Sequence, residues 1–237
     1  GIVADATATL AALTAEIPAA DHHAEAVTER LRGSVDRRVD ELVDGEPPLS
    51  SPGALRAVRA AVPDDAIVAA DAGGFRIWAL ATFPATGPRS YVNPGSWATM
   101  GSGLPSALGA QAANPDSDVV ALAGDGGLMM AIHELHTAAA EELPVTTVVF
   151  RNEDYAIISD GAEREHGLPE GTYAWGDSPI DFVALAESMG VGAARAATPA
   201  EIREAVADAV DADEPRLVEV PTDPDEPQAS DYLTRSN

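Results

Sequence analysis

The sequence predicts an α/β domain with a doubly wound, mainly parallel sheet and helices on both faces. The first observation is a series of short, β-branched apolar runs, the pattern of strands that are buried on both faces of a parallel sheet. The second is that segments with helical apolar spacing separate these runs, as in βαβ units. The expected strands span residues 66–70, 91–93, 118–123, 145–150, 191–196 and 216–220.

Helix signals lie between the expected strands. Ser51 and Pro52 mark a helix start, an N-cap followed by proline at the first helical position. Apolar residues recur at helical spacing from Leu128 to Ala139, so one continuous helix is expected there, ended by Pro144. The expected helices span residues 52–61, 75–81, 104–113, 128–143, 179–189 and 199–212, the last with Thr198 as its N-cap.

Residues 156–175 lack a clear period and are dense in glycine and charge. They are expected to form either a surface loop or a mobile lid that orders over a substrate. Tyr155, Arg164 and His166 are the candidate substrate contacts in this region. The polar tail, residues 222–237, is expected to be loosely held.

The first fifty residues precede the compact domain, which is expected to span residues 51–221. Residues 1–17 end in an Ala/Leu-rich helix and are too short to bury a core alone. Residues 21–50 are interpreted as a helical linker, with His22 and His23 at a solvated helix start rather than in a metal site. The apolar stripe of this helix consists of Leu31, Val35, Val39 and Leu42.

Charge dominates the composition. The chain has 39 acidic and 14 basic residues, a formal net charge of −25, and every basic residue is arginine. Such a surface repels nucleic acid and anionic membranes, so neither is an expected partner. The acids are spread along the chain, which favours adaptation to concentrated salt, where repulsion is screened, over a cationic partner. A halophilic source is therefore expected.

Cysteine is absent, which excludes a disulfide framework, a thiol nucleophile and a zinc–thiolate site. The sequence has neither a signal-like segment nor an apolar run long enough to span a bilayer, so a soluble protein is expected, with the cytoplasm as the default compartment.

A glycine-rich turn, Gly124-Asp125-Gly126-Gly127, follows the expected strand 118–123. Glycines let the backbone turn sharply and bring N–H groups close to an anion. Asn152 follows the next strand, so a carboxylate and an amide should meet at the ligand-binding edge of the sheet. Oxygen ligands suit magnesium or calcium, and N–H groups at a helix start suit phosphate. The pattern indicates a diphosphate ligand bridged by Mg²⁺, with a plain turn or N-cap as the alternative role of Asp125.

The stretch from GDG through a helix and a buried strand to asparagine resembles the cofactor motif of thiamine-diphosphate-dependent enzymes, in particular the acetolactate synthase and 2-oxo-acid decarboxylase group. The resemblance implies that thiamine diphosphate and Mg²⁺ are the cofactors. The common motif ends in two asparagines, and Arg151 replaces the first, outside the ligand position. The implied metal ligands are Asp125, the Asn152 side chain and the Asp154 carbonyl, and the implied diphosphate residues are Gly124, Gly126 and Gly127.

Two further segments carry the resemblance. The turn that contains Gly73 and Gly74 corresponds to the first diphosphate loop of the family. Acetolactate synthases usually carry Gln and His side chains at positions 74 and 75, whereas Gly74 and Phe75 leave only backbone N–H groups, which weakens that subfamily assignment. Met100 resembles the bulky apolar residue that holds the cofactor in its bent conformation, and the Ala98 carbonyl would accept from the aminopyrimidine amine. A loop with one buried methionine is the alternative.

His133 and His136 are three residues apart on the expected central helix and could hold a metal. The sequence offers no third ligand nearby, so two residues on a helix face are the favoured interpretation. Glu134 is interpreted as structural.

The resemblance also implies a missing part. The family's activating glutamate comes from a pyrimidine-binding domain of the same or another subunit, and no stretch here resembles that domain. The chain is therefore expected to have no catalytic residue of its own, to be inactive alone, and to belong to a longer, homodimeric or tetrameric enzyme that acts on a 2-oxo acid. Residues 1–20 would then be the end of a preceding middle domain. A simple decarboxylase of benzoylformate or indolepyruvate type and a non-catalytic module that binds thiamine diphosphate are the alternatives.

Overall fold

The computed structural model describes residues 1, 3–17, 24–43, 45–176, 178–229 and 232, and the chain divides into two compact units, Gly1–Asp36 and Arg37–Asn237. The first unit contains helix α1 (Ala6–Glu16), whose N-cap Asp5 accepts a hydrogen bond from the Ala8 N–H at 2.9 Å. No residue of α1 is buried. Helix α2 (Ala24–Asp40) includes the boundary between the units. His22 and His23 lie outside the described residues.

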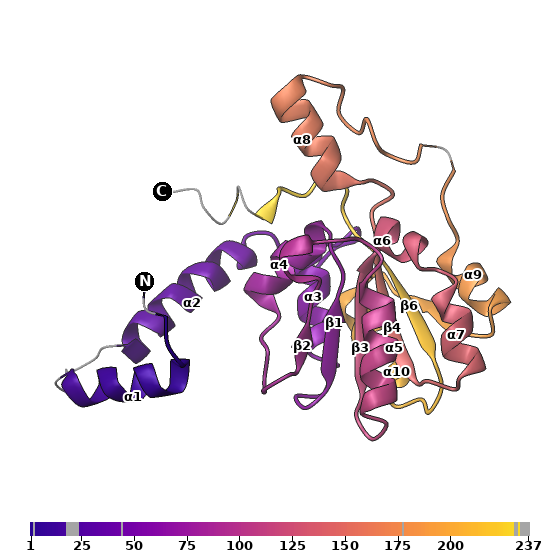
Figure 1. The fold of residues 1–237 in the computed structure, drawn as a ribbon. Helices are drawn as coiled ribbons and strands as arrows, with labels where there is room; N and C mark the ends of the chain where they lie inside the picture. Colours follow the sequence, from indigo (N-terminus) through magenta and orange to yellow (C-terminus); the bar gives the residue numbers. More distant parts are fainter. Residues whose placement is uncertain (2, 18–23, 44, 177, 230–231, 233–237) are drawn as a thin grey trace. The chain divides into compact units, whose positions relative to one another are not determined.

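The second unit is built on a six-stranded parallel sheet with the order β2-β1-β3-β4-β6-β5 (Figure 1). Every strand pair is parallel, and in the register of the central pair Gly124 lies opposite Phe150. The predicted doubly wound parallel sheet is thereby confirmed. The strands are β1 (Ile67–Ala70), β2 (Tyr91–Val92), β3 (Val119–Gly124), β4 (Val145–Arg151), β5 (Gly192–Arg195) and β6 (Arg216–Pro221).

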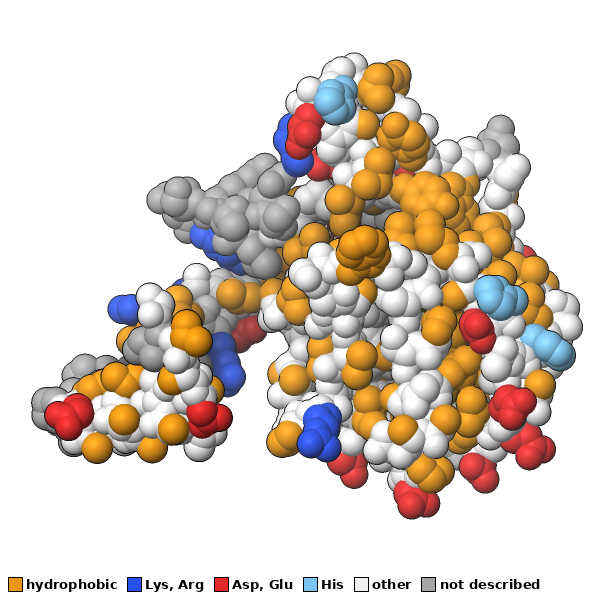
Figure 2. Space-filling model, in the orientation of Figure 1, with side chains coloured by type: hydrophobic (Ala, Val, Ile, Leu, Met, Phe, Trp, Pro, Cys, Tyr) orange, Lys and Arg blue, Asp and Glu red, His pale blue; other side chains and the backbone are white. Residues whose placement is uncertain are grey.

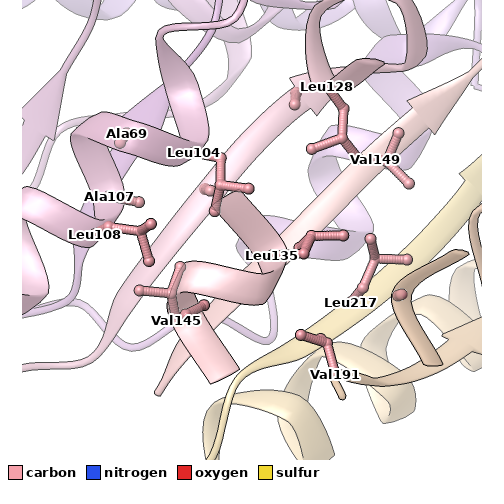
Figure 3. Close-up of a cluster of buried hydrophobic side chains, with 14 of the residues drawn as sticks. Ala69, Leu104, Ala107, Leu108, Leu128, Leu135, Val145, Val149, Val191 and Leu217 are labelled. Carbon is pink, nitrogen blue, oxygen red and sulfur yellow. The ribbon is translucent and has the colours of Figure 1, made fainter. Parts of the chain in front are cut away.

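Helices cover both faces of this sheet because successive strand residues point to opposite sides. One face forms a hydrophobic cluster with α5 (Gly103–Ala113), α6 (Asp125–Met130), α7 (Glu134–Ala140) and α9 (Phe182–Ser188), and Figure 3 shows Leu104 and Leu135 turned toward the strands. On the other side α10 (Pro199–Val210) packs on β4, β6 and α3 (Ser51–Arg59), and α3 packs on α4 (Gly74–Thr82). No helix in the described part of the chain combines the length and hydropathy needed to cross a membrane.

The central helix differs from the prediction. One helix was expected over residues 128–143, but the structure has two, α6 and α7, separated by residues 131–133. The Ala131 N–H bonds to the Leu128 carbonyl three residues back, which ends α6. Leu128 and Leu135 are both buried all the same. Periodicity identified the residues that face the core, but it does not reveal a break between them.

Residues 156–166 also differ from the prediction, because they form helix α8 (Ala156–His166) and not a loop. The helix buries only Ser159 and Ala162, so the sequence carries no apolar stripe that would reveal it. Gly167, at φ 63°, ends the helix in the left-handed conformation that glycine adopts without steric cost. In Figure 1, α8 stands over the end of the sheet where α6 begins.

The described part of the tail is held against the domain, in contrast to the loose tail expected from residue 222. The Thr222 N–H donates to the Arg151 carbonyl at 2.8 Å, and the Asp223 N–H donates to the Leu49 carbonyl at 2.9 Å. Thr222 and Ala229 are buried. These are backbone contacts with residues far away in sequence, so a polar composition does not predict them.

Candidate functional site

A cavity of about 250 Å³ lies at the carboxyl edge of the sheet. Asp71, Asp125 and Asn152 directly follow the neighbouring parallel strands β1, β3 and β4, so all three lie at this edge of the sheet. Hydrophobic side chains gather at the foot of α8, above the strand ends (Figure 2). All ten residues predicted to bind the cofactor or the metal line this one cavity: Gly73, Gly74, Ala98, Met100, Gly124, Asp125, Gly126, Gly127, Asn152 and Asp154.

Asp125 ties the loops after β3 and β4 together. Its Oδ1 accepts from the Gly126 N–H at 2.7 Å, and its Oδ2 accepts from the N–H groups of Asn152 at 3.0 Å and Glu153 at 2.7 Å. Burial raises the pKa of Asp125 to about 6, although these N–H groups act in the opposite direction. A carboxylate that is costly to ionise is stabilised by a nearby cation, so this position suits a metal ligand.

The loop after β4 turns sharply at Glu153, which has a left-handed φ of 61°. The Asn152 Oδ1 accepts from the Asp154 N–H at 3.2 Å, and the Glu153 carbonyl accepts from the Trp175 N–H at 2.8 Å. Asn152 and Asp154 both line the cavity as a result. Among the described residues, no group of three or more His, Asp or Glu side chains could hold a metal. The other hard oxygen donors at this position are amide and carbonyl oxygens.

Arg151, the departure from the two-asparagine motif, connects this loop to the sheet. Its Nε forms an ion pair with Glu219 Oε1 at 2.8 Å, and its Nη1 bonds Glu153 Oε1 at 2.5 Å. Glu219 is completely buried, and the Arg195 guanidinium binds both of its carboxylate oxygens, at 2.9 and 3.1 Å. Arg151 thus fixes the position of Glu153, whose N–H donates to the Asp125 carboxylate.

The glycine turn leaves bare backbone at the cavity. A Cβ on Gly126 would lie 2.5 Å from the Tyr155 ring, and a Cβ on Gly127 would lie 2.3 Å from Asp71 Oδ2. Only glycine fits at these two positions without displacing a neighbour. Their N–H groups can therefore approach a ligand closely, as a diphosphate requires.

Asp71 has a positioning role that the sequence prediction missed. Its Oδ1 accepts from the N–H groups of Ala72 at 2.8 Å and Ser102 at 3.0 Å, and its Oδ2 accepts from the Gly101 N–H at 2.9 Å. These bonds fix the loop that carries Met100. The signal was available, because β1, like β3, is followed directly by an aspartate and then closely by two glycines.

Ala98 and Met100 form another wall of the cavity. Ala98 has a left-handed φ of 52°, a conformation that glycine adopts more readily than alanine. Met100 Cε would be 3.3 Å from a Cβ on Gly126, so the methionine side chain ends beside the glycine turn.

The remaining candidates divide between the cavity and the surface. Tyr155 lines the cavity and packs edge-on against Trp175, with ring centroids 6.1 Å apart. Arg164 and His166 are exposed on α8 and are not among the residues that line it. His133 and His136 are also exposed, and His133 lies 3.5 Å from Glu134, which agrees with a helix-face role.

Several cavity residues were not predicted. Glu226 lines the cavity from the tail and accepts a hydrogen bond from the Ser51 N–H, and burial raises the pKa of its carboxyl to about 7. No local pattern in a polar tail distinguishes such a residue. The unpredicted lining residues include Ser51, Arg76, Ile157, Glu226 and Gln228.

The fold and the cavity together define an α/β domain with a cavity between two glycine turns, at the carboxyl edge of a parallel sheet, where domains of this class bind ligands. The family described as "Thiamine pyrophosphate enzyme, C-terminal TPP binding domain" matches residues 71–220, and the chain belongs to this family. Thiamine diphosphate is accordingly its cofactor, and the predicted resemblance is confirmed.

Relatives extend the comparison. The chain is 39% identical over 158 residues to a "Probable acetolactate synthase large subunit" of Methanococcus aeolicus, covering 67% of this chain and 26% of the relative. It is 33% identical over 181 residues to the "Acetolactate synthase isozyme 1 large subunit" of Escherichia coli, covering 76% and 32%. A solved structure, the thiamine diphosphate-dependent 4-hydroxybenzoylformate decarboxylase of Rhodococcus jostii, superposes with a TM-score of 0.68 at 32% identity, covering 74% and 33%. The chain thus spans about a quarter to a third of the length of these relatives.

Proposed function

We propose that this chain is the part of an acetolactate-synthase-like 2-oxo-acid carboligase or decarboxylase that binds Mg²⁺ and the diphosphate of thiamine diphosphate. The observation that carries the proposal is the meeting of Asp125, Asn152 and Asp154 beside a bare glycine turn in one cavity. This arrangement combines hard oxygen donors with backbone N–H groups, as a metal-bridged diphosphate requires.

Asp125, the Asn152 side-chain oxygen and the Asp154 carbonyl are the proposed protein ligands of Mg²⁺. All three are hard oxygen donors, and Mg²⁺ typically completes its shell with phosphate oxygens and water. The cost of ionising the buried Asp125 supports the proposal, since the cation offsets that cost. Asp125 also orients the loop of the other two ligands through its bonds to the N–H groups of Asn152 and Glu153.

The remaining cavity residues are proposed to position the cofactor. Gly124, Gly126 and Gly127, together with Gly73 and Gly74, offer backbone to the diphosphate. Met100 would pack against the cofactor, and the Ala98 carbonyl would accept a hydrogen bond from its amine. Bound thiamine diphosphate supplies a carbon nucleophile that stabilises the charge left when a 2-oxo acid loses CO₂. Tyr155 and the cavity's apolar side chains exclude water from that charge.

The activity is proposed to require a pyrimidine-binding domain, which supplies the activating glutamate from the same or another subunit. General acid–base assistance of this kind contributes on the order of 10²–10⁴-fold in rate. Without it, this chain should bind the cofactor and remain silent.

The test measures CO₂ release from pyruvate and benzoylformate by the full-length gene product and by this chain alone, each with Mg²⁺ and thiamine diphosphate. Turnover by the full-length protein but not by this chain supports the proposal. The product then distinguishes carboligation, which joins two carbonyl compounds, from simple decarboxylation, which gives an aldehyde. Cofactor binding without any turnover would favour the non-catalytic module. Steady turnover by this chain alone would contradict the partner glutamate.

A further inference from the structure

Among the described residues, a single arginine lines the cavity at the carboxyl edge of the sheet. The other charged residues that line this cavity, within the described part of the chain, are the acids Asp125, Asp154 and Glu226. The arginine is Arg76, in the first turn of α4. Its Nε atom is buried with no hydrogen-bond partner among the described residues, and none of the ion pairs found there involves Arg76. In a chain with 39 acidic residues, an arginine without a carboxylate partner requires an explanation.

The position of Arg76 is unfavourable for a cation when no anion is present. The first turn of a helix carries partial positive charge, so a basic residue there is repelled. Nothing local compensates, because α4 has no acidic residue in its first turn and its N-cap, Gly73, has no side chain to cap it. Local rules of this kind are commonly broken at functional sites. A bound anion would reverse the sign of the interaction, since the guanidinium and the helix end would both attract it.

We propose that Arg76 binds an oxyanion in this cavity, a phosphate or carboxylate group that keeps its negative charge throughout the reaction. Given the proposed function, the group is the terminal phosphate of the cofactor or the carboxylate of an acceptor 2-oxo acid. The carboxylate that leaves as CO₂ is a poor partner. An ion pair would stabilise it in the ground state and weaken as neutral CO₂ forms, which raises the barrier.

The experiment is a calorimetric titration of the chain with inorganic pyrophosphate and, separately, with pyruvate and with thiamine diphosphate, each with and without Mg²⁺. The variants are Arg76→Gln, Arg76→Lys and, as a control, Arg203→Gln, which removes the same charge from an exposed position of α10 outside the lining residues. We expect Arg76→Gln to lower the affinity of the chain for one of the two anions, pyrophosphate or pyruvate, by about tenfold. Arg76→Lys should retain part of the affinity, because it keeps the charge without the fork geometry. Arg203→Gln should change it less than twofold. Unchanged melting curves will establish that the variants fold.

The outcomes separate the two sources. If Arg76→Gln lowers the affinity for pyrophosphate alone, the group bound by Arg76 is the cofactor phosphate. If it lowers the affinity for pyruvate alone, the group is the acceptor carboxylate. Equal affinities of wild type and Arg76→Gln for both anions overturn the proposal, and so does a wild-type chain that binds neither. If Arg76 controls pyrophosphate binding while thiamine diphosphate shows no Mg²⁺ dependence, the proposed function fails and the anion site stands.

Discussion

Asp125→Asn separates the folding cost of the Asp125 carboxylate from its proposed use in metal binding. Burial raises the pKa of this group from 3.8 to about 6 in the folded chain. Because the folded protein holds the proton more tightly than the unfolded chain, stability falls as the pH rises from about 4 to 6 and is constant above that. The shift corresponds to a cost of about 3 kcal/mol at pH 7. Of this cost, about 1 kcal/mol develops between pH 5 and pH 7.

The asparagine does not titrate, so it removes this pH dependence. Its amide nitrogen would face a backbone N–H that now donates to Asp125, such as that of Gly126, which costs about 1–3 kcal/mol at any pH. The free energy of unfolding of the variant relative to wild type should therefore rise by about 1 kcal/mol from pH 5 to pH 7 when Mg²⁺ is absent. With Mg²⁺ and thiamine diphosphate present, wild type should become the more stable protein, since the cation binds only the carboxylate form.

Urea denaturation in molar KCl at pH 5 and pH 7 measures both effects. Asp213→Asn is the matched control, because Asp213 is exposed and lies outside the cavity. It should show no change in relative stability between the two pH values. A relative stability of Asp125→Asn that does not depend on pH, or that falls from pH 5 to pH 7, would refute the reasoning.

Three further predictions concern the site and the surface. Gly127→Ala should lower the free energy of unfolding by about 2 kcal/mol or more, because its Cβ would meet the Asp71 carboxylate. Gly161→Ala, in open space on α8, should raise the free energy of unfolding by up to about 1 kcal/mol. Equal effects of the two substitutions in urea denaturation would contradict the geometry of the glycine turn. Arg151→Met should lower the free energy of unfolding by about 2 kcal/mol, because the buried Glu219 loses one of its two cations. It should also weaken Mg²⁺ binding, because the loop of the proposed ligands loses its ion pair with the sheet, and calorimetry that finds full Mg²⁺ affinity would exclude this role of Arg151. The acidic chain should melt at a lower temperature as KCl is reduced from molar to millimolar concentration, and a melting temperature independent of salt would leave its net charge of −25 unexplained.

The elements that the sequence predicted are those defined by local pattern. Buried parallel strands are short apolar runs, so the runs near Val119 and Val145 identified the centre of the sheet. Asp125 and Asn152 were predicted as metal ligands because they follow those strands directly and carry hard oxygen donors. Strand order then brought both residues to one cavity.

The features that the sequence did not predict depend on contacts between distant residues. Helix α8 buries too few side chains to show an apolar period. Asp71 acts through N–H groups about thirty residues away, and Glu226 reaches the cavity across 175 residues by accepting from Ser51. Arg76 lies within a helix that was predicted, but only the folded chain reveals that its guanidinium lines the cavity without a partner. Asp71 repeats the turn pattern that follows β3, but Arg76 and Glu226 leave no local pattern to find.

The most direct measurement is an isothermal titration of this chain with thiamine diphosphate, in the presence and absence of Mg²⁺, for wild type and Asp125→Ala. The proposed site predicts saturable binding of one cofactor per chain that requires Mg²⁺ and is lost in Asp125→Ala, while the variant keeps a cooperative melting transition. Binding of equal strength without Mg²⁺, or undiminished binding by Asp125→Ala, would show that Asp125 is not a metal ligand and would contradict the proposed site.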